Sequence, residues 1–284
     1  MKKNKLLFLF LFISSTIIAQ KKAFVIFDSQ GLKTTYQELF DQSRKADIIL
    51  FGELHDNPIN HWLQLELTKD LFNVSEKLVL GAEMMESDNQ LVIDEYLTGL
   101  VSKSKLISET KTWPNFKTDY FPLIQFSKEN KLSFIATNVP RRYASIVYQH
   151  GLDTLSFLSD KAKSYMAPLP ILYDTSLSSY QEMLAMGMDH GGDNLPKSQA
   201  LKDATMAHFI VENWKKGQTF IHFHGAFHSK NYEGINWYLK HESKRIKTIT
   251  ISSYEQDDLN QLDEGQVGIA DFIIVTPTNM TKTH

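Results

Sequence analysis

Short apolar runs recur along the chain, and each ends in polar residues or glycine. They cover residues 23–27, 48–51, 78–80, 132–136, 220–223, 248–251 and 272–275. Apolar runs of this length without strict alternation are typical of strands that are buried on both faces, as in a parallel sheet. The pattern therefore predicts seven strands, most of them in one parallel sheet.

Helical patterns lie between these runs. Pro58 suits the first position of a helix, and the apolar residues that follow it are spaced four apart, at Ile59, Leu63, Leu67 and Leu71. Such a stripe is typical of a helix packed on a core. Strands that alternate with helices favour an α/β fold in which helices flank the sheet.

Three further helices are predicted from capping residues and periodicity. The first starts at a capping box, the second ends at a glycine cap, and the third is amphipathic. They cover Ser87–Gln90 through about Leu100, Tyr143 to Gln149 with Gly151 as the cap, and Asp203 to Lys215.

Residues 87–205 contain a single predicted strand, at 132–136, and are otherwise helical or irregular in pattern. We interpret this stretch as a helical lobe inserted in the middle of the chain. No linker rich in proline, glycine or serine marks its boundaries. Residues 21–284 are therefore expected to form a single domain.

The first 20 residues have the pattern of a secretory signal peptide. Lys2, Lys3 and Lys5 precede an apolar run from Leu6 to Ile18, and a basic start followed by a short apolar stretch is typical of such a signal. The run is shorter than the roughly 20 residues that a membrane-spanning helix needs. We expect export to the periplasm or out of the cell.

The composition limits which metal ligands, covalent links and partners the chain can have. The chain has no cysteine, which excludes disulfides, thiolate ligands and a lipid anchor on an N-terminal cysteine. A bound metal or haem iron would need histidine, carboxylate, tyrosine or methionine ligands. The net charge of −3 and the lack of a basic stripe argue against nucleic acid as a partner.

Chemically capable residues follow several predicted strands. His55 follows the strand at 48–51, Glu83 follows 78–80 and His228 follows 220–223. Ligands of open α/β sheets bind beyond the carboxyl ends of the strands, so we expect these three side chains to lie within about 10 Å of one another. They could hold a divalent metal or act as an acid/base set.

The two histidines share the spacing Gly-x-x-His, as Gly52–His55 and Gly225–His228. A glycine at the end of a strand allows the sharp turn that this spacing requires. Other polar residues are expected to line the same pocket, namely Glu53, His61, Asn138, Arg141, Asp203 and His224. Ordinary roles stay open for some of them: Glu53 as a helix cap, His61 as a surface histidine and His224 as a core group.

A second group of residues lies in the middle of the chain. Tyr165, Tyr173, Tyr180 and His190 accompany methionines between residues 183 and 188. Methionine and aromatic residues at helical spacing pack cores, but they also line apolar haem clefts, and tyrosine, histidine and methionine are haem ligands. The pattern does not choose an axial ligand among them.

An ordered set of motifs resembles the ChaN-like proteins of the haem-uptake and Tiki superfamily. The motifs are Gly52–Pro58, Gly81–Met84, Trp113-Pro114, Asn138–Arg141, Lys202–Ala207 and Gly225–His228. The resemblance implies an α/β fold and an exported haem-binding protein that serves haem or iron acquisition. It further implies a tyrosine ligand to haem, a homodimer and an outer-membrane uptake system as a partner.

Related branches of the superfamily are metal-dependent proteases and erythromycin esterase-like hydrolases. Their active-site histidines and glutamate match His55, Glu83 and His228. The resemblance favours a haem- or iron-binding protein, and a metal-dependent esterase or peptidase stays open as the alternative.

Overall fold

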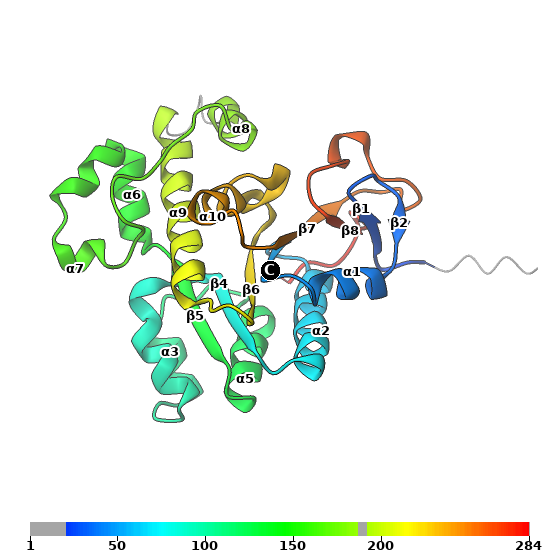
Figure 1. The fold of residues 1–284 in the computed structure, drawn as a ribbon, viewed down its shortest axis with the longest axis horizontal. Coiled ribbons are helices and arrows are strands. Elements are labelled where there is room, and N and C mark those ends of the chain that lie inside the picture. The colour runs from blue at the N-terminus through cyan, green and yellow to red at the C-terminus, as the bar shows by residue number, and fades with distance from the viewer. Residues whose placement is uncertain (1–20, 187–191, 284) are drawn as a thin grey trace, which may run out of the picture.

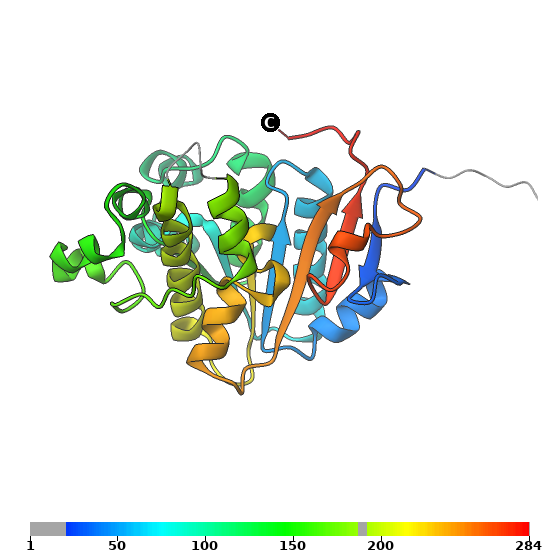
Figure 2. The same ribbon diagram turned by 90° about the horizontal axis from the view of Figure 1, so that it is seen from above.

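The computed structural model describes residues 21–186 and 192–283, so the predicted signal peptide and His190 lie outside the described residues. An eight-stranded sheet is flanked by helices on both faces (Figures 1 and 2). Its strands are β1 (Val25–Asp28), β2 (Lys33–Thr34), β3 (Ile48–Glu53), β4 (Leu78–Glu86), β5 (Ser133–Asn138), β6 (Thr219–Gly225), β7 (Thr248–Glu255) and β8 (Phe272–Thr276).

The strand order is β2-β1-β8-β7-β3-β6-β4-β5. The strands from β8 to β5 pair in parallel, whereas β1 pairs antiparallel with both β8 and β2. All seven predicted strands and the mainly parallel α/β fold are thus confirmed. The two-residue β2 was missed because it is too short to carry a pattern.

Strand β3 occupies the position that matters for the site. From β3 the chain runs outward to β4 and β5, returns to β6 between β3 and β4, and then crosses to β7 on the other side of β3. All residues of β3 are buried, and its last residue, Glu53, is in register with Gly225 of β6. Such a change of direction in strand order creates a crevice at the carboxyl ends of the strands.

The α-helices range from one turn to five. They are α1 (Tyr36–Ser43), α2 (Pro58–Val74), α3 (Gln90–Leu97), α4 (Lys103–Glu109), α5 (Phe121–Glu129), α6 (Arg141–His150), α7 (Asp160–Lys163), α8 (Ser178–Met186), α9 (Leu195–Asn213) and α10 (Ile235–Glu242). Within the described residues, no helix has the length and apolar character needed to cross a membrane.

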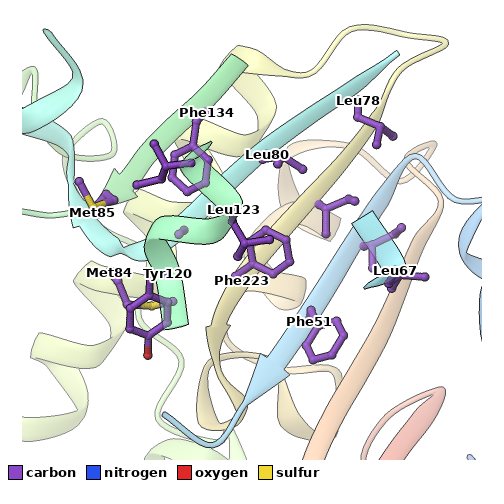
Figure 3. Packing of buried hydrophobic residues seen from close by; sticks show 14 of the residues in the cluster. Phe51, Leu67, Leu78, Leu80, Met84, Met85, Tyr120, Leu123, Phe134 and Phe223 are labelled. Carbon is purple, nitrogen blue, oxygen red and sulfur yellow. The ribbon is translucent and has the colours of Figure 1, made fainter. Parts of the chain in front are cut away.

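The two faces of the sheet carry separate apolar cores. On one face, Phe51, Leu80 and Phe223 pack against Leu67 of α2 and Leu123 of α5 (Figure 3). Alternate residues of the strands point to the other face, where they meet α9 and α10. Residues 87–205 contribute to both layers, because α3, α4 and α5 join the α2 layer while α9 packs beside α10.

Helix α2 starts as predicted, with Pro58 in its first turn. The Asn57 side chain caps it by accepting from the backbone N–H groups of Ile59 (3.1 Å) and Asn60 (3.3 Å). A cap of this kind stabilises a helix by about 1 kcal/mol. It also fixes the short loop that carries His55 between β3 and α2.

The predicted capping box at Ser87–Gln90 is wrong. Ser87 donates instead to the backbone oxygen of Tyr165 (2.7 Å), and α3 begins at Gln90. The Gln90 amide pairs with the edge strand β5, donating to Phe134 O (3.0 Å) and accepting from Ala136 N (2.7 Å). The Gln90 side chain therefore covers part of the exposed edge of β5 and does not take part in a helix cap.

Candidate functional site

A pocket of about 830 Å³ opens at the carboxyl ends of β3, β4 and β6. The structure brings His55, Glu83 and His228 together in its wall. The remaining side chains in the wall combine large apolar groups with a few polar ones. They include Glu53, Trp113, Met183, Gln199, Lys202, Phe227, Lys230, Tyr254 and Ile269.

His55 is the accessible histidine of this group. Its side chain is 35% exposed, and its ring packs edge-on against Trp113 with the ring centroids 4.7 Å apart. Nδ1 lies 2.9 Å from Oε1 of Glu53. Because a carboxylate only accepts hydrogen bonds, Nδ1 carries the proton, and Nε2 holds a lone pair in the neutral ring.

The space in front of this nitrogen depends on Gly225. A Cβ atom on residue 225 would lie 2.7 Å from His55 Nε2 and 3.6 Å from Glu83 Oε2. Any side chain there would overlap the histidine. The second Gly-x-x-His motif therefore lets the His55 ring pack closely against β6 and also allows a turn off the strand.

A buried polar network holds His55 from behind. Tyr120 donates to Glu53 Oε1 (2.7 Å), and the Gln64 amide donates to Glu53 Oε2. His61 Nε2 lies 3.0 Å from the backbone oxygen of His55, which also accepts from Asn115 (2.8 Å). Glu53 and His55 are thus fixed in position by several hydrogen bonds.

His61 lies in this supporting network and not in the pocket wall as predicted. Its side chain is 6% exposed, beneath the ring of Tyr120, and Nε2 also lies 3.4 Å from Oδ2 of Asp119. The sequence pattern placed it on a helix but did not indicate that this face of α2 is covered by the segment 115–120.

A second buried chain of charges runs through His228. Nε2 lies 3.1 Å from Oε1 of Glu83, and Nδ1 lies 2.5 Å from Oδ1 of Asp203. Asp203 Oδ2 accepts from the hydroxyl of Tyr180 (3.0 Å), and the other oxygen of Glu83 accepts from Gly225 N (2.8 Å). Each carboxylate is therefore satisfied on both oxygens.

This arrangement favours the protonated form of His228. Burial works against a charged ring, but the charges and hydrogen bonds of Glu83 and Asp203 outweigh burial and raise the pKa of His228 to about 9. In return, burial opposes ionisation of Glu83, yet the charge of His228 dominates and holds the pKa of Glu83 well below its usual value. The pair is an imidazolium–carboxylate ion pair at neutral pH.

Asp203 is 1% exposed and lies behind His228, so it is not a pocket-lining residue as predicted. Burial raises the pKa of its carboxyl, although the charge of His228 opposes that effect. Gly234, at φ +53°, allows the backbone of His228 to lie close to it, because a Cβ at residue 234 would lie 2.2 Å from the backbone oxygen of His228. Position 234 therefore requires glycine.

His224 is also misplaced by the prediction, because it is fully buried behind the pocket together with His222. The two Nδ1 atoms lie 3.0 Å apart, His222 Nε2 lies 2.7 Å from Thr137 Oγ1, and His224 Nε2 lies 2.8 Å from Ser229 Oγ. Burial lowers the pKa of His222 well below its usual value and that of His224 to about 3. Both rings are neutral core groups.

Asn138 and Arg141 line an adjoining pocket of about 300 Å³ that shares Glu83, Trp113 and Lys202 with the first. They follow β5, as the strand-end argument predicted. The two pockets meet at Glu83, so Asn138 and Arg141 lie on the same edge of the sheet as His55 and His228.

The tyrosines predicted as haem ligands have different environments. Tyr180 is 1% exposed with its hydroxyl donated to Asp203, so it is closed to an external ligand. Tyr173 is half-buried and stacks on Tyr180 with the centroids 5.5 Å apart. Tyr165 is half-buried beneath the Lys161 ammonium. Tyr165 packs against a different apolar cluster from Tyr173 and Tyr180. His190 lies outside the described residues.

The predicted metal set of His55, Glu83 and His228 is not formed as a ligand set. Both ring nitrogens of His228 face carboxylates, so this ring offers no lone pair. In the part of the chain that the structure describes, no group of three or more histidine and carboxylate side chains has the arrangement of a metal site. Zinc sites need three such ligands.

Sequence reasoning did not assign several residues to the site, although Tyr120 lies beside the motif Trp113-Pro114. Asn115, Asp119 and Tyr120 come from a short π-helix, Phe116–Tyr120, and the residue before it. Gln199, on α9, contacts Nδ1 of His228 (2.8 Å). A π-helix often marks a functional site, but it has no simple sequence periodicity.

The fold and this site define an α/β protein with a ligand pocket where the strand order changes direction. Residues 39–239 match the family described as haem-binding uptake, Tiki superfamily, ChaN. The chain belongs to this family, and the resemblance noted in its sequence is confirmed.

A solved structure of the family supports the fold. A structure described as cofacial haem binding to ChaN of Campylobacter jejuni matches with a TM-score of 0.66 and 19% identity, over 89% of this chain and 96% of that chain. The erythromycin esterase EreC matches with a TM-score of 0.45 and 10% identity, over 88% of this chain and 82% of that one.

One curated relative comes from a plant. Protein RETICULATA-RELATED 5, chloroplastic, of Arabidopsis thaliana is 21% identical over 192 residues, which are 62% of this chain and 26% of that protein. The chain thus spans about a quarter of the length of this relative.

Proposed function

We propose that this chain is an exported haem-binding protein that serves haem or iron acquisition, and that haem binds in the pocket beside His55. The observation that carries the proposal is a partly exposed histidine, His55, that lines the pocket and is hydrogen-bonded through Nδ1, in a chain of the haem-binding uptake family. Within the described residues, no protein atom hydrogen-bonds to Nε2 of this ring, whereas Nδ1 is held by Glu53.

The residues of the pocket fit haem. Metal-ligating histidines usually donate their other N–H to a carboxylate, as His55 does to Glu53. Trp113, Phe227 and Ile269 supply apolar walls for a macrocycle, and the volume of about 830 Å³ is within the usual range of ligand pockets. His55, through Nε2, would hold the iron of bound haem, and the haem would supply an iron centre at this pocket.

A haemin titration tests this assignment. We expect a saturable Soret shift with about one haem per chain, and His55→Ala should weaken binding roughly tenfold or more because the axial ligand is lost. His150→Ala is the matched control, since His150 is exposed at the end of α6.

Two results would count against the assignment. Equal affinity of the wild type and His55→Ala would remove His55 as the ligand. Loss of a phenolate charge-transfer band on Tyr165→Phe or Tyr173→Phe would move the ligand to one of the tyrosines that the sequence suggested.

The metal-dependent hydrolase is not favoured as an alternative. That reading needs His55, Glu83 and His228 as three ligands, but His228 is committed to Glu83 and Asp203. An imidazolium between two carboxylates would have to lose its proton and a partner before it could bind a cation.

The proposal also includes export of the chain and a role in iron uptake. Lys2, Lys3, Lys5 and the apolar run Leu6–Ile18 support export. Fractionation of cells that express the full chain, compared with a chain lacking residues 1–20, tests it. Growth with haem as the iron source tests the physiological role, and sedimentation tests the homodimer. Crosslinking tests an outer-membrane uptake partner.

A further inference from the structure

The segment that follows β8, residues 277–283, turns back toward the loop that carries His55. It contains a turn in which Met280 N donates to Pro277 O (3.1 Å). Thr278 Oγ1 donates to the Asp257 carboxylate, which ties the start of the segment to the residues after β7. The segment then runs toward the carboxyl end of β3 and the start of α2 (Figures 1 and 2).

Two contacts join this segment to Asp56, the residue after His55. Lys282 Nζ lies 3.3 Å from Oδ1 of Asp56, and the backbone N–H of Thr283 donates to the backbone oxygen of Asp56 (2.9 Å). Asp56 itself lines the His55 pocket. The 277–283 segment therefore holds a residue of the pocket wall through both a charge and a backbone hydrogen bond.

Lys282 also links Asp56 to Glu255, the last residue of β7. Its ammonium donates to Oε1 of Glu255, and the same oxygen accepts from the side-chain amide of Asn57 (3.0 Å). Burial opposes the charge on Lys282, but the hydrogen bonds to Glu255 and Asp56 outweigh burial and raise the pKa of the ammonium. Lys282 is therefore a cation between two carboxylates, and such a network stabilises more than an isolated surface pair.

The same loop has a second, more deeply buried anchor. The backbone oxygen of His55 accepts from Asn115 (2.8 Å), whose side chain is 3% exposed. By contrast, the side chains of Asp56 and Lys282 are 38% and 31% exposed. Contacts that water reaches open more readily than contacts inside a core. The anchor at Lys282 is therefore the one that can release the loop without unfolding the core.

We propose that Lys282 is a positioning residue that fixes the β3–α2 loop, and with it His55, at the edge of the pocket. Its ammonium acts on His55 through Asp56, the adjacent residue of the loop. This role goes beyond the proposed haem function, because the loop is held whichever ligand fills the pocket.

Hydrogen exchange of single amides, followed by NMR in the folded chain, tests this role without a ligand. The amide of Thr283 reports on the 277–283 segment, because it donates to Asp56 O. The amides of Leu54 and Asn57 report on the loop, since Leu54 N donates to Asn60 Oδ1 (2.9 Å) and Asn57 N donates to Leu54 O (2.9 Å). Amides of β6 and α10 serve as internal references for the rest of the fold.

Lys282→Met removes the charge and keeps most of the side-chain length, whereas Lys282→Arg keeps the charge. Lys69→Met is the matched control, because Lys69 pairs with Glu66 at the surface of α2 (2.8 Å). We expect Lys282→Met to speed exchange at the three reporting amides roughly three- to fivefold, as for the loss of a partly exposed ion pair. Lys282→Arg and Lys69→Met should match the wild type.

Two further measurements separate positioning by charge from a general structural role. Salt at about 0.5 M, where the Debye length is roughly 4 Å, should bring the wild type closer to Lys282→Met. Asp56→Asn should speed exchange of the loop in the same way, and adding it to Lys282→Met should have a smaller effect than in the wild type, since the pair is already broken.

Slow exchange at Leu54 and Asn57 in Lys282→Met, as in the wild type, would overturn the proposal. So would equally faster exchange in β6 and α10, because Lys282 would then support the fold as a whole. Faster exchange in Lys282→Arg would show that the charge does not position the loop, with the same consequence.

A haemin titration of the wild type keeps this role separate from the haem assignment. If haemin gives no Soret shift, the haem assignment is wrong, while the exchange rates still decide the role of Lys282. If haemin binds but Lys282→Met leaves exchange of the loop unchanged, haem binding stands and Lys282 does not position His55.

Discussion

Nδ1 of His228 lies 2.5 Å from the carboxylate of Asp203, while Nε2 of the same ring lies 3.1 Å from Glu83. A ring held between two buried carboxylates is stable only as an imidazolium, because both of its nitrogens must donate. The wall of the His55 pocket therefore includes a buried ion pair, His228 with Glu83 and Asp203, whose hydrogen bonds are complete without a ligand.

This relationship predicts a loss of stability at alkaline pH. The pKa of His228 is raised to about 9 in the folded chain, above the value of about 6.5 in the unfolded chain. The stabilisation is therefore fully present below about pH 6.5 and is lost as pH rises through about 9. Urea denaturation between pH 6 and 10 should show a fall of a few kcal/mol in the free energy of unfolding.

Asp203→Asn should flatten this fall. The variant removes one of the two carboxylates that raise the pKa of His228, and it should lower the free energy of unfolding at pH 7 by roughly 3 kcal/mol. Asp153→Asn, at an exposed position, is the control. An alkaline slope as steep in Asp203→Asn as in the wild type would contradict the assignment.

Gly225→Ala tests the close packing of the His55 ring against residue 225. The added Cβ would lie 2.7 Å from Nε2 of His55, and the histidine must move to accommodate it. We expect haemin affinity to fall roughly tenfold or more, with little change in the circular dichroism spectrum. Gly265→Ala is the matched control, because no atom lies within 4 Å of its Cβ position. Full haemin affinity in Gly225→Ala would place the iron elsewhere.

The sequence was sufficient to predict what depends on strand ends. His55, Glu83 and His228 each follow a buried strand, and parallel strands bring their carboxyl ends to one edge of the sheet. The fold class followed from the same apolar runs. These features are encoded locally, by runs of a few residues and the turns after them.

The sequence could not predict which polar residues lie in front of the site and which lie behind it. Tyr180 and Asp203 are separated by 23 residues in the chain, yet the Tyr180 hydroxyl donates a hydrogen bond to the Asp203 carboxylate. Aromatic spacing placed Tyr180 in a haem slot because a pattern does not indicate where a hydroxyl points. The partners of Glu53 were missed because Tyr120 reaches it across 67 residues.

His222 and His224 predict a loss of stability at acid pH. Both are fully buried, and burial lowers the pKa of His224 to about 3. The unfolded chain therefore binds more protons than the folded chain below about pH 6.5, so stability falls as pH decreases from there toward 3. His224→Gln should cost about 1–3 kcal/mol at pH 7 but lose less on acidification. Equal slopes in urea denaturation at pH 7, 6 and 5 would contradict this.

The pH dependence of haem binding should report on His55 and Glu53. Burial opposes a charge on His55, but the hydrogen bond to Glu53 and the charges of Glu83 and Glu53 outweigh it and raise the pKa of His55. A protonated Nε2 has no lone pair for iron, so haemin affinity should fall as pH decreases through this pKa. Protoporphyrin, which has no iron, should show no such transition.

Glu53→Gln should shift that transition to lower pH. The variant removes the charged acceptor of the His55 Nδ1–H group and lowers the pKa of the ring, so Nε2 stays unprotonated in more acidic solution. Glu66→Gln is the control, because Glu66 pairs with Lys69 at the surface of α2. The measurement is the midpoint of haemin affinity against pH in the three proteins. A shift to higher pH in Glu53→Gln, or an equal shift in Glu66→Gln, would show that His55 is not the titrating ligand.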